Sequence, residues 1–432
     1  MSLTGKLNIF KKYKEKLNNK FNVVNDEVIK LSHENIKLRF KVKKLAGEKI
    51  NVIFICHRPA VWGSLKTVYE AMKEDPVFNV TIITCPNKKQ LPKIGLCHEI
   101  FESEGADEFW KGENVIPGYN YEKDEWLDLR TLNPDYVFFQ RPYNIEFSLL
   151  YKSWEITKFA RICYVEYGYN TNKKMALECI PADFMKDVSL FFLQNAVENE
   201  WYNEYFSEMN NSFTKRYITG FPRFDFLERY KNSESDNWKN VHNNRFRIIW
   251  TPRWATEEKN CHFFTYKNQL TEYCMKNTDS IDLVLRPHPQ MFTNFKTTGE
   301  MSEKEIIEFE KIFTESDNMT LDKTKEYLNT FYSSDCLIAD YTSLIPEYFL
   351  TGKPIIYCYN EKALYNIEGE IFNGLYLVHN WEELVSTLEL LKQGRDSLKA
   401  KRDEIIKNYF NISETGAGYK IKEIIKNDFY GE

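Results

Sequence analysis

The chain has 432 residues and a formal net charge of −5, and 43% of its residues are hydrophobic. That apolar fraction, with 16% aromatic residues, excludes a disordered or collagen-like chain, and the length predicts two domains. No apolar run approaches the roughly 18–20 residues that cross a bilayer, and we expect a cytoplasmic protein without a signal peptide. The nine cysteines occur singly with no CxxC pair, so we expect reduced thiols and no metal site.

The charge is unevenly distributed along the chain. Residues 1–47 carry twelve Lys or Arg and four Asp or Glu, a net charge of +8, so the remainder carries −13. An acidic body argues against a nucleic-acid enzyme, which would spread basic charge over its binding face, so we expect no nucleic-acid partner. The basic arm suits a solvated lysine-rich helix, or an anionic membrane surface with the protein peripheral at its inner face.

The same arm contains a heptad repeat. Two series recur at seven-residue spacing: Leu17, Val24, Leu31, Leu38 and Leu45, and Phe21, Val28, Asn35 and Val42. This a/d pattern predicts a coiled coil, and the single Asn at an a position is typical of parallel two-stranded coils. We therefore predict a homodimer through residues 17–45, with Glu34 and Arg39 pairing between chains. The alternative is an amphipathic helix that packs on its own body or lies on a membrane.

The remaining sequence predicts two α/β halves. Short apolar runs predict buried strands at 51–56, 80–85, 135–140, 162–165, 188–193, 247–250, 282–285, 336–339 and 355–358. Helical spacing predicts helices at 62–73, 263–276, 324–332, 344–350, 381–408 and 417–429. Alternating strands and helices are typical of parallel sheets covered on both faces. The polar, turn-rich segment 232–244 predicts a linker between two doubly wound domains that face a cleft.

The predicted domain boundaries follow from these patterns. The first segment, 1–47, is the heptad helix, and 48–235 and 236–408 are two doubly wound, Rossmann-like domains. The last segment, 409–432, is expected to cross back onto the first domain.

Polar residues follow six of the predicted strands, where ligands bind in doubly wound sheets. These residues are His57, Arg58, Arg141, Glu166, Arg253, Arg286, His288, Asp340, Thr342 and Ser343. The arginines and histidines suit an anionic ligand, because a guanidinium group contacts phosphate in a bidentate manner. Two prolines fix the backbone on either side of His288. Thr342 or Ser343 is expected to cap a helix whose N-terminus attracts an anion, and Glu347 in its first turns suits nucleoside hydroxyls.

Five segments resemble the CDP-glycerol glycerophosphotransferase family, whose members build teichoic acids and whose relatives build capsular polymers. They are GFPRFD at 220–225, TPRW at 251–254, RPHP at 286–289, DYTS at 340–343 and GKPIIY at 352–357. The resemblance implies a GT-B-like fold in which the first domain binds the acceptor and the second binds the CDP-activated donor. It implies transfer of glycerol phosphate, or a related alditol phosphate, to a hydroxyl of a free or lipid-linked glycan or polymer. The resemblance implies release of CMP. We expect no required cofactor, because the sequence has no Asp-x-Asp pair to indicate Mg²⁺, although loosely bound Mg²⁺ is compatible with it.

One departure from the family concerns the catalytic base. The family typically has a His-Gly-Thr stretch after the strand equivalent to 162–165, and here Tyr167 takes the His position. Tyrosine is a poor base at neutral pH because its unperturbed pKa is about 10. We therefore expect Glu166, or else His57 across the cleft, to act as the base, and the resemblance implies that His288 contacts the diphosphate. The expected substrate-binding residues are Arg141, Arg253, Arg286, Asp340, Thr342, Ser343 and Glu347.

Two other functions remain alternatives at this level. A glycosyltransferase that uses a nucleotide-sugar donor shares the GT-B scaffold, and a fold does not fix a function. A non-catalytic assembly protein is the lesser alternative, because the family histidine is absent and the heptad helix could recruit partners. The products of the reaction separate the first two functions, since only transfer from a CDP-alditol releases CMP.

Overall fold

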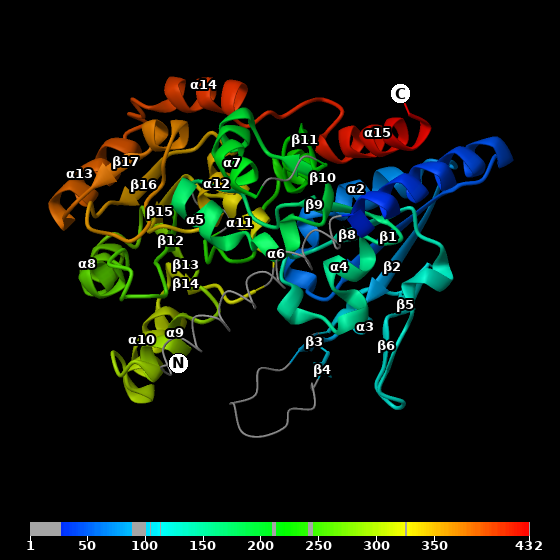
Figure 1. Cartoon of the computed structure of the whole chain (residues 1–432). Helices are drawn as coiled ribbons and strands as arrows, with labels where there is room; N and C mark the ends of the chain where they lie inside the picture. The colour runs from blue at the N-terminus through cyan, green and yellow to red at the C-terminus, as the bar shows by residue number, and fades with distance from the viewer. Residues whose placement is uncertain are drawn as a thin grey trace, which may run out of the picture.

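The structure is a computed structural model that describes residues 27–88, 101–103, 105–112, 114–209, 213–240, 245–324 and 326–431. Two parallel sheets lie side by side, each covered by helices (Figure 1). The predicted α/β fold with two doubly wound domains is confirmed. No helix among the described residues is long and apolar enough to cross a membrane.

The N-terminal sheet has seven strands in the order β11-β10-β9-β8-β1-β2-β5, and all neighbouring pairs are parallel. The strands are β1 Ile50–Cys56, β2 Phe78–Thr84, β5 Val115–Pro117, β8 Tyr136–Phe139, β9 Arg161–Val165, β10 Val188–Leu193 and β11 Lys215–Ile218. The central strands are buried on both faces, which explains their continuous apolar runs. The strand order reverses between β1 and β8, and we call this place the N-terminal switch point.

The C-terminal sheet has six strands in the order β14-β13-β12-β15-β16-β17, again all parallel. The strands are β12 Phe246–Thr251, β13 Ile281–Leu285, β14 Met319–Leu321, β15 Cys336–Ala339, β16 Ile355–Cys358 and β17 Tyr376–Val378. Its order reverses between β12 and β15, which we call the C-terminal switch point. Two small antiparallel hairpins complete the strands: β3 Asn87–Lys88 with β4 Phe101–Glu102, and β6 Tyr119–Asn120 with β7 Glu125–Trp126.

Helices cover both sheets. Those of the N-terminal domain are α2 Lys66–Lys73, α3 Ala106–Phe109, α4 Ser153–Ile156, α5 Lys173–Cys179, α6 Ala182–Met185 and α7 Ala196–Glu208. Those after it are α8 Phe263–Lys276, α9 Met291–Thr297, α10 Glu303–Glu315, α11 Leu328–Ser333, α12 Leu344–Phe349, α13 Trp381–Lys392, α14 Lys399–Tyr409 and α15 Ala417–Tyr430. The single helix predicted at 381–408 is wrong. The chain breaks after α13 because Gly394 adopts a positive φ of 74°, which glycine accommodates without strain.

The N-terminal helix, residues 27–46, packs on its own domain through one face. Ile36 and Phe40 join the core of that domain, and Lys43 pairs with the buried Asp135. The predicted pairing of Glu34 with Arg39 between chains stays a prediction. Arg39 donates a 2.7 Å hydrogen bond to the Pro134 carbonyl and lies 3.4 Å from Asp135 in its own chain.

The heptad positions of this helix face away from the body. The described ones are 40% to 89% exposed: Val28, Leu31, Leu38, Val42 and Leu45. Asn35 is also exposed. The helix therefore has two apolar faces, one buried against its own domain and one open. The remaining heptad positions, Leu17, Phe21 and Val24, lie outside the described residues.

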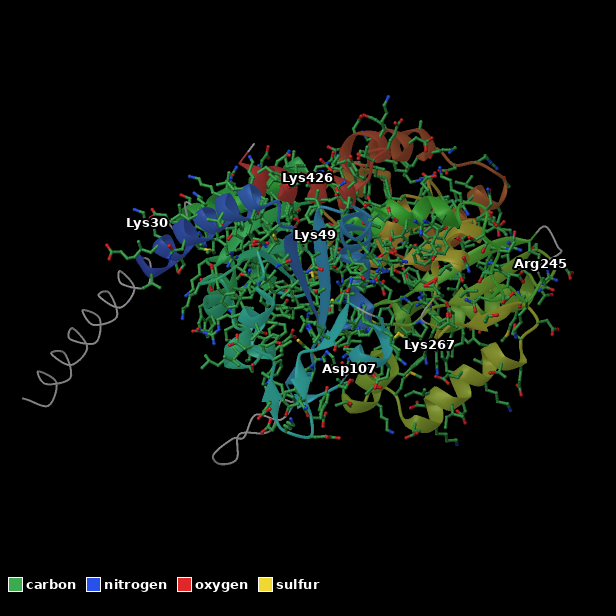
Figure 2. All side chains as sticks on the ribbon, turned by 90° about the vertical axis from the view of Figure 1, so that its right-hand side faces the viewer. Lys30, Lys49, Asp107, Arg245, Lys267 and Lys426 are labelled. Atoms are coloured by element: carbon green, nitrogen blue, oxygen red, sulfur yellow. The ribbon has the colours of Figure 1, made fainter. Side chains whose placement is uncertain are left out.

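The last helix, α15, returns to the N-terminal domain and packs against α2. Ile421, Ile425 and Phe429 belong to the same apolar cluster as the strands of the N-terminal sheet. The Phe429 ring lies 4.8 Å from that of Phe40, centroid to centroid. Figure 2 shows α15, which carries Lys426, beside the N-terminal helix. Both ends of the described chain thus complete one domain.

The start of α15 is held by the GFPRFD segment. The Asp225 carboxylate accepts hydrogen bonds from the backbone N–H groups of Ala417 (2.7 Å) and Gly418 (2.8 Å). The Thr67 hydroxyl on α2 donates a third bond to it, of 2.8 Å. A Cβ atom at Gly418 would lie 2.5 Å from the Thr67 carbonyl carbon, so the close approach of these helices requires glycine. Asp225 therefore joins three segments that are distant in sequence.

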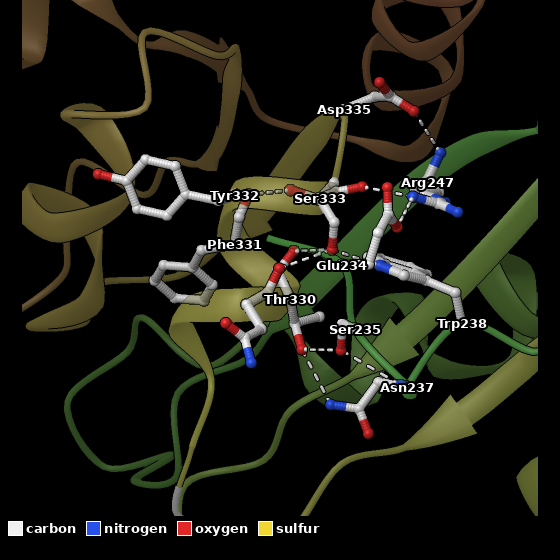
Figure 3. A network of polar contacts seen from close by, with 12 residues as sticks. Glu234, Ser235, Asn237, Trp238, Arg247, Thr330, Phe331, Tyr332, Ser333 and Asp335 are labelled. Carbon is white, nitrogen blue, oxygen red and sulfur yellow. Dashed lines mark hydrogen bonds and ion pairs between the residues drawn. The ribbon is translucent and has the colours of Figure 1, made fainter. Parts of the chain in front are cut away.

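The segment predicted as a linker is firmly attached to the C-terminal domain (Figure 3). The Trp238 indole N–H donates to the Ser333 hydroxyl (2.8 Å), and the Ser235 hydroxyl contacts that of Thr330 (2.8 Å). The Arg247 guanidinium on β12 donates to Glu234 (3.1 Å) and lies over the Trp238 ring. Residues 234–238 therefore move with the C-terminal domain, and residues 241–244 lie outside the described part of the chain.

Two buried carboxyl groups support the loop after β9. Glu166 accepts a 2.5 Å hydrogen bond from the Tyr202 hydroxyl, and Glu198 accepts 2.7 Å bonds from the Asn170 side chain and the Gln194 backbone. Burial raises the pKa of Glu166, and burial followed by the nearby Glu166 raises the pKa of Glu198. The pair therefore favours a protonated state in the folded protein.

Replacing Asp225 by Ala should lower the free energy of unfolding by about 2 kcal/mol, because it leaves the first amides of α15 without their acceptor. Urea unfolding of Asp225→Ala and of the wild-type protein would measure the difference. Glu228→Ala, in the same 3₁₀ helix (Pro222–Tyr230) but exposed, is the control and should stay within about 0.5 kcal/mol of wild type. Equal stability of Asp225→Ala and wild type would show that Asp225 does not hold α15.

The Glu166–Glu198 pair predicts that stability falls as the pH rises. A carboxyl group with a raised pKa in the folded state is destabilising once the pH exceeds its unfolded value of about 4.3. The penalty is complete above the folded pKa, which is about 8 for Glu198. Between pH 5 and pH 8, Glu198→Gln should therefore lose less unfolding free energy than wild type, by about 1 kcal/mol or more. Glu200→Gln, exposed on the same helix, should follow the wild-type curve, and identical curves for all three proteins would refute the assignment.

Candidate active site

The C-terminal switch point is occupied by a hydrogen-bonded group around Asp340. One oxygen of this buried carboxylate accepts the backbone N–H groups of Arg253 (2.8 Å) and His262 (2.9 Å). Its other oxygen lies 2.7 Å from Nδ1 of the His262 ring. Asp340 was predicted to bind substrate directly, and the structure gives it contacts that position neighbouring groups of the chain.

His262 is a site residue that the sequence did not reveal. It precedes α8 and follows no strand, so a search for polar residues directly after predicted strands does not find it. Because a carboxylate only accepts hydrogen bonds, the contact with Asp340 places the ring proton on Nδ1 and leaves Nε2 as an acceptor in the neutral ring.

The group around Asp340 also includes a cysteine at the end of β16. One ligand atom from each of His262, Asp340 and Cys358 lies within 4.8 Å of the others, so these residues can supply three metal ligands. The Asp340 oxygens already serve three N–H groups, and burial raises the pKa of the Cys358 thiol well above its usual value. A protonated thiol is a poor metal ligand, so the arrangement suits hydrogen bonding better than an ion.

His288 is held in one tautomer. The backbone N–H of Gln290 donates to Nδ1 of His288 (3.2 Å), so in the neutral ring the proton is on Nε2. Partial burial, and then the charge of Arg253, lowers the pKa of His288. The ring also stacks on Trp254, with centroids 5.4 Å apart. His288 is therefore a neutral, oriented hydrogen-bond donor on an exposed segment.

The two predicted arginines of this domain are engaged in ion pairs. Arg253 binds Glu258 with two hydrogen bonds of 2.7 and 2.8 Å. Arg286 contacts Asp322 at 2.5 Å and lies 4.7 Å above the ring of Tyr327. The contacts of Arg286 with Asp322 and Tyr327 hold the Arg-Pro-His-Pro segment in place, which helps to fix the position of the His288 ring.

Glu347 is also held by its own chain. One oxygen accepts from Arg223 Nε at 2.8 Å, and the other accepts from the Tyr327 hydroxyl at 2.6 Å. Arg223 belongs to the GFPRFD segment and Glu347 to α12, so this ion pair joins the end of the first domain to the second. Thr342 accepts the N–H of Leu344 at 3.4 Å. Ser343 is the N-cap residue of α12, but its side chain forms no capping bond.

A second group lies at the N-terminal switch point. His57 follows β1 and Arg141 follows β8, and both contact the carboxylate of Glu146, with 3.0 Å from His57 Nε2. Burial opposes the charge of Glu146, but the hydrogen bond from His57 and the nearby cations hold its pKa below the usual value. Burial lowers the pKa of His57. His57 and Glu166, the two predicted bases, are both buried in this conformation.

The structure therefore assembles the predicted residues into two groups rather than one. Arg253, Arg286, His288, Asp340 and the start of α12 gather at the C-terminal switch point, whereas His57, Arg141 and Glu166 follow neighbouring strands of the N-terminal sheet. The two domains are in contact after β9, where the Asn172 amide donates to Glu368 at 2.7 Å.

Several solved structures share the fold of this chain. A putative UDP-N-acetylglucosamine 2-epimerase from Listeria monocytogenes is 15% identical, with a TM-score of 0.58, over 89% of this chain and 98% of that one. The wall teichoic acid polymerase TagF is 13% identical, with a TM-score of 0.55, over 98% of both chains. The S. aureus MnaA–UDP structure is 13% identical, with a TM-score of 0.55, over 88% and 97%. These similarities establish the GT-B-like fold, and a comparison with curated proteins gives no match.

A family model matches residues 166–427, more than half of the chain. It describes CDP-glycerol:poly(glycerophosphate) glycerophosphotransferases, and its range contains the segments around Arg223, His288 and Asp340. The predicted resemblance is confirmed. The chain belongs to the CDP-glycerol:poly(glycerophosphate) glycerophosphotransferase family.

Proposed function

We propose that this enzyme transfers glycerol phosphate from CDP-glycerol to a hydroxyl group of a teichoic-acid-like or capsular polymer and releases CMP. Family membership supports the reaction class, and the observation that carries the proposal is the fixed Nε2–H of His288 beside Arg253 and Arg286. A neutral donor with one proton position suits a phosphoryl oxygen, because the hydrogen bond is in place before charge develops there.

The reaction is a displacement at phosphorus. The acceptor hydroxyl oxygen forms a bond to the β-phosphorus of CDP-glycerol, and the bond from that phosphorus to the bridging oxygen breaks. CMP leaves with the electron pair of that bond, and the acceptor proton passes to a base. His288 stabilises the charge on the transferring group, and the rigid Pro287 and Pro289 keep it in position.

The donor nucleotide is expected at the C-terminal switch point. Ser343 has a hydroxyl free of capping, and Thr342 lies next to it, so both suit the diphosphate. The Glu347 oxygens each retain a lone pair for a ribose hydroxyl, and Arg223 and Tyr327 keep the carboxylate in place.

Replacing His288 by Ala should lower the rate of CMP release from CDP-glycerol by about 10²-fold, because one oriented donor to the phosphoryl group is lost. His379→Ala is the control, since His379 is exposed and pairs with Glu383 on a distant helix. A variant His288→Ala within threefold of wild type would remove this role. Release of a nucleoside diphosphate from a nucleotide-sugar, with no CMP from CDP-glycerol, would contradict the proposed reaction and favour a glycosyltransferase.

We further propose that two copies of the chain pair through the open heptad face of the N-terminal helix. Five large apolar side chains are exposed there at heptad spacing, while the opposite face is already buried on the body. Exposed Asn35 lies in the same stripe and suits pairing with its twin. The lysines that flank the stripe leave the outside of such a coil basic, which suits an anionic membrane carrying a lipid-linked acceptor.

The double substitution Leu31→Lys with Leu38→Lys should convert the dimer to a single chain, because it places like charges in the seam of the coil. Both side chains are more than half exposed, so the fold of the single chain should be unaffected. Light scattering after size-exclusion chromatography, at several concentrations, would give the mass. Lys30→Gln with Lys37→Gln is the matched control, and a wild-type mass of one chain would contradict the proposal.

A further inference from the structure

The N-terminal switch point has a rigid frame. The side-chain oxygen of Gln140, which follows β8, accepts the backbone N–H groups of His57 (2.8 Å) and Arg58 (2.9 Å), which follow β1. The Gln140 amide returns a 3.2 Å hydrogen bond to the Arg58 carbonyl. These bonds fix the two strand ends relative to each other. The side chains of His57, Arg58 and Arg141 therefore start from fixed backbone positions.

Three basic side chains converge on one carboxylate at this place. Glu146 contacts His57 Nε2 at 3.0 Å, the guanidinium of Arg141, and Arg58 Nη2 at 3.7 Å. The Glu146 side chain is 15% exposed, and that of Arg58 is 36% exposed. Arg58 and Arg141 thus both face this carboxylate near the surface.

Two tyrosines orient the guanidinium of Arg141. It lies 4.6 Å from the centroid of the Tyr143 ring and 5.4 Å from that of Tyr167, and the two hydroxyls are 3.0 Å apart. Aromatic faces hold a guanidinium plane in place and leave its edge available for hydrogen bonds. Tyr167, which stands where the family has histidine, is thus part of an arginine platform in this chain.

We propose that Arg58, Arg141, Tyr143 and Tyr167 form a binding site for a phosphate group of the acceptor, and that Glu146 occupies it when the acceptor is absent. A phosphate oxygen would replace the carboxylate oxygen on Arg141, and the Glu146 side chain would turn toward solvent. Arginine forks bind carboxylate and phosphate with the same geometry, which makes this exchange chemically conservative. The inference rests on the proposed function, since it assigns the acceptor side of that reaction.

Isothermal titration calorimetry can test the site without any transfer reaction. The full chain is saturated with CDP, so that the nucleotide site is filled, and is titrated with a glycerol phosphate oligomer or with inorganic pyrophosphate. Tighter binding of the oligomer would identify a phosphodiester of the polymer as the ligand. Tighter binding of pyrophosphate would identify the diphosphate of a lipid-linked primer.

The variants should change the affinity in opposite directions. Arg141→Gln should weaken binding about tenfold, because a charge-assisted hydrogen bond is lost. Glu146→Gln should tighten it about threefold or more, because the competing negative charge is removed. Arg130→Gln is the matched control, since Arg130 pairs with Asp128 on the surface of the same domain and should leave the affinity unchanged.

A purely structural role for the group would give a different pattern. Glu146→Gln would then weaken binding as Arg141→Gln does, or neither would change it, and either result overturns the proposal. Thermal unfolding of both variants excludes loss of the fold as the cause. In the transfer assay, Arg141→Gln should raise KM for the acceptor and leave KM for CDP-glycerol unchanged. A wild-type enzyme inactive with CDP-glycerol would refute the proposed function, whereas the calorimetric result would still decide on the phosphate site.

Discussion

The carboxylate of Asp225 is the contact on which the arrangement of this molecule depends. It receives two amides from the start of α15 and one hydroxyl from α2, so it attaches the end of the chain to the first domain. Two residues earlier in the same 3₁₀ helix, Pro222–Tyr230, Arg223 pairs with Glu347 of the second domain. With three residues per turn, positions two apart face different directions. The GFPRFD segment thus acts as a joint that holds both domains at once.

The guanidinium groups near the two switch points share one kind of contact. Each is paired with a carboxylate of its own chain: Arg141 with Glu146, Arg223 with Glu347, Arg253 with Glu258 and Arg286 with Asp322. An ion pair removes much of the net charge but fixes the direction of the donors. This is why the proposed function gives the contact with the transferring phosphoryl group to the oriented, neutral His288, whose Nε2 has no hydrogen bond to any residue that the structure describes. Because donors with fixed directions remain at the switch points, an acidic protein body is compatible with an anionic substrate.

Most of the buried strands could be predicted from the sequence, because central strands of parallel sheets are continuous apolar runs. The edge strands β5, β11, β14 and β17 were missed, since they are short and partly exposed. The strand-end rule found His288 and Asp340 but not Tyr327, His262 or Glu146, whose roles depend on loops that meet only in the folded chain. The heptad pattern identified one face of the N-terminal helix. The other face, which buries Ile36 and Phe40, could not be recognised from the sequence. Its apolar pattern is too short to be identified without the domain that it covers.

The return of α15 has a consequence for how this protein is made. The first domain buries Ile421, Ile425 and Phe429, which are synthesised after every strand of the second sheet. A ribosome therefore releases the whole second domain before the core of the first domain can close. Until then, the surface of α2 that α15 covers is exposed to solvent. The second domain can fold first, because its sheet uses only residues 246–378. Assembly of this enzyme runs against the direction of translation, and a nascent chain that stalls before α15 would present an unfinished apolar surface to chaperones.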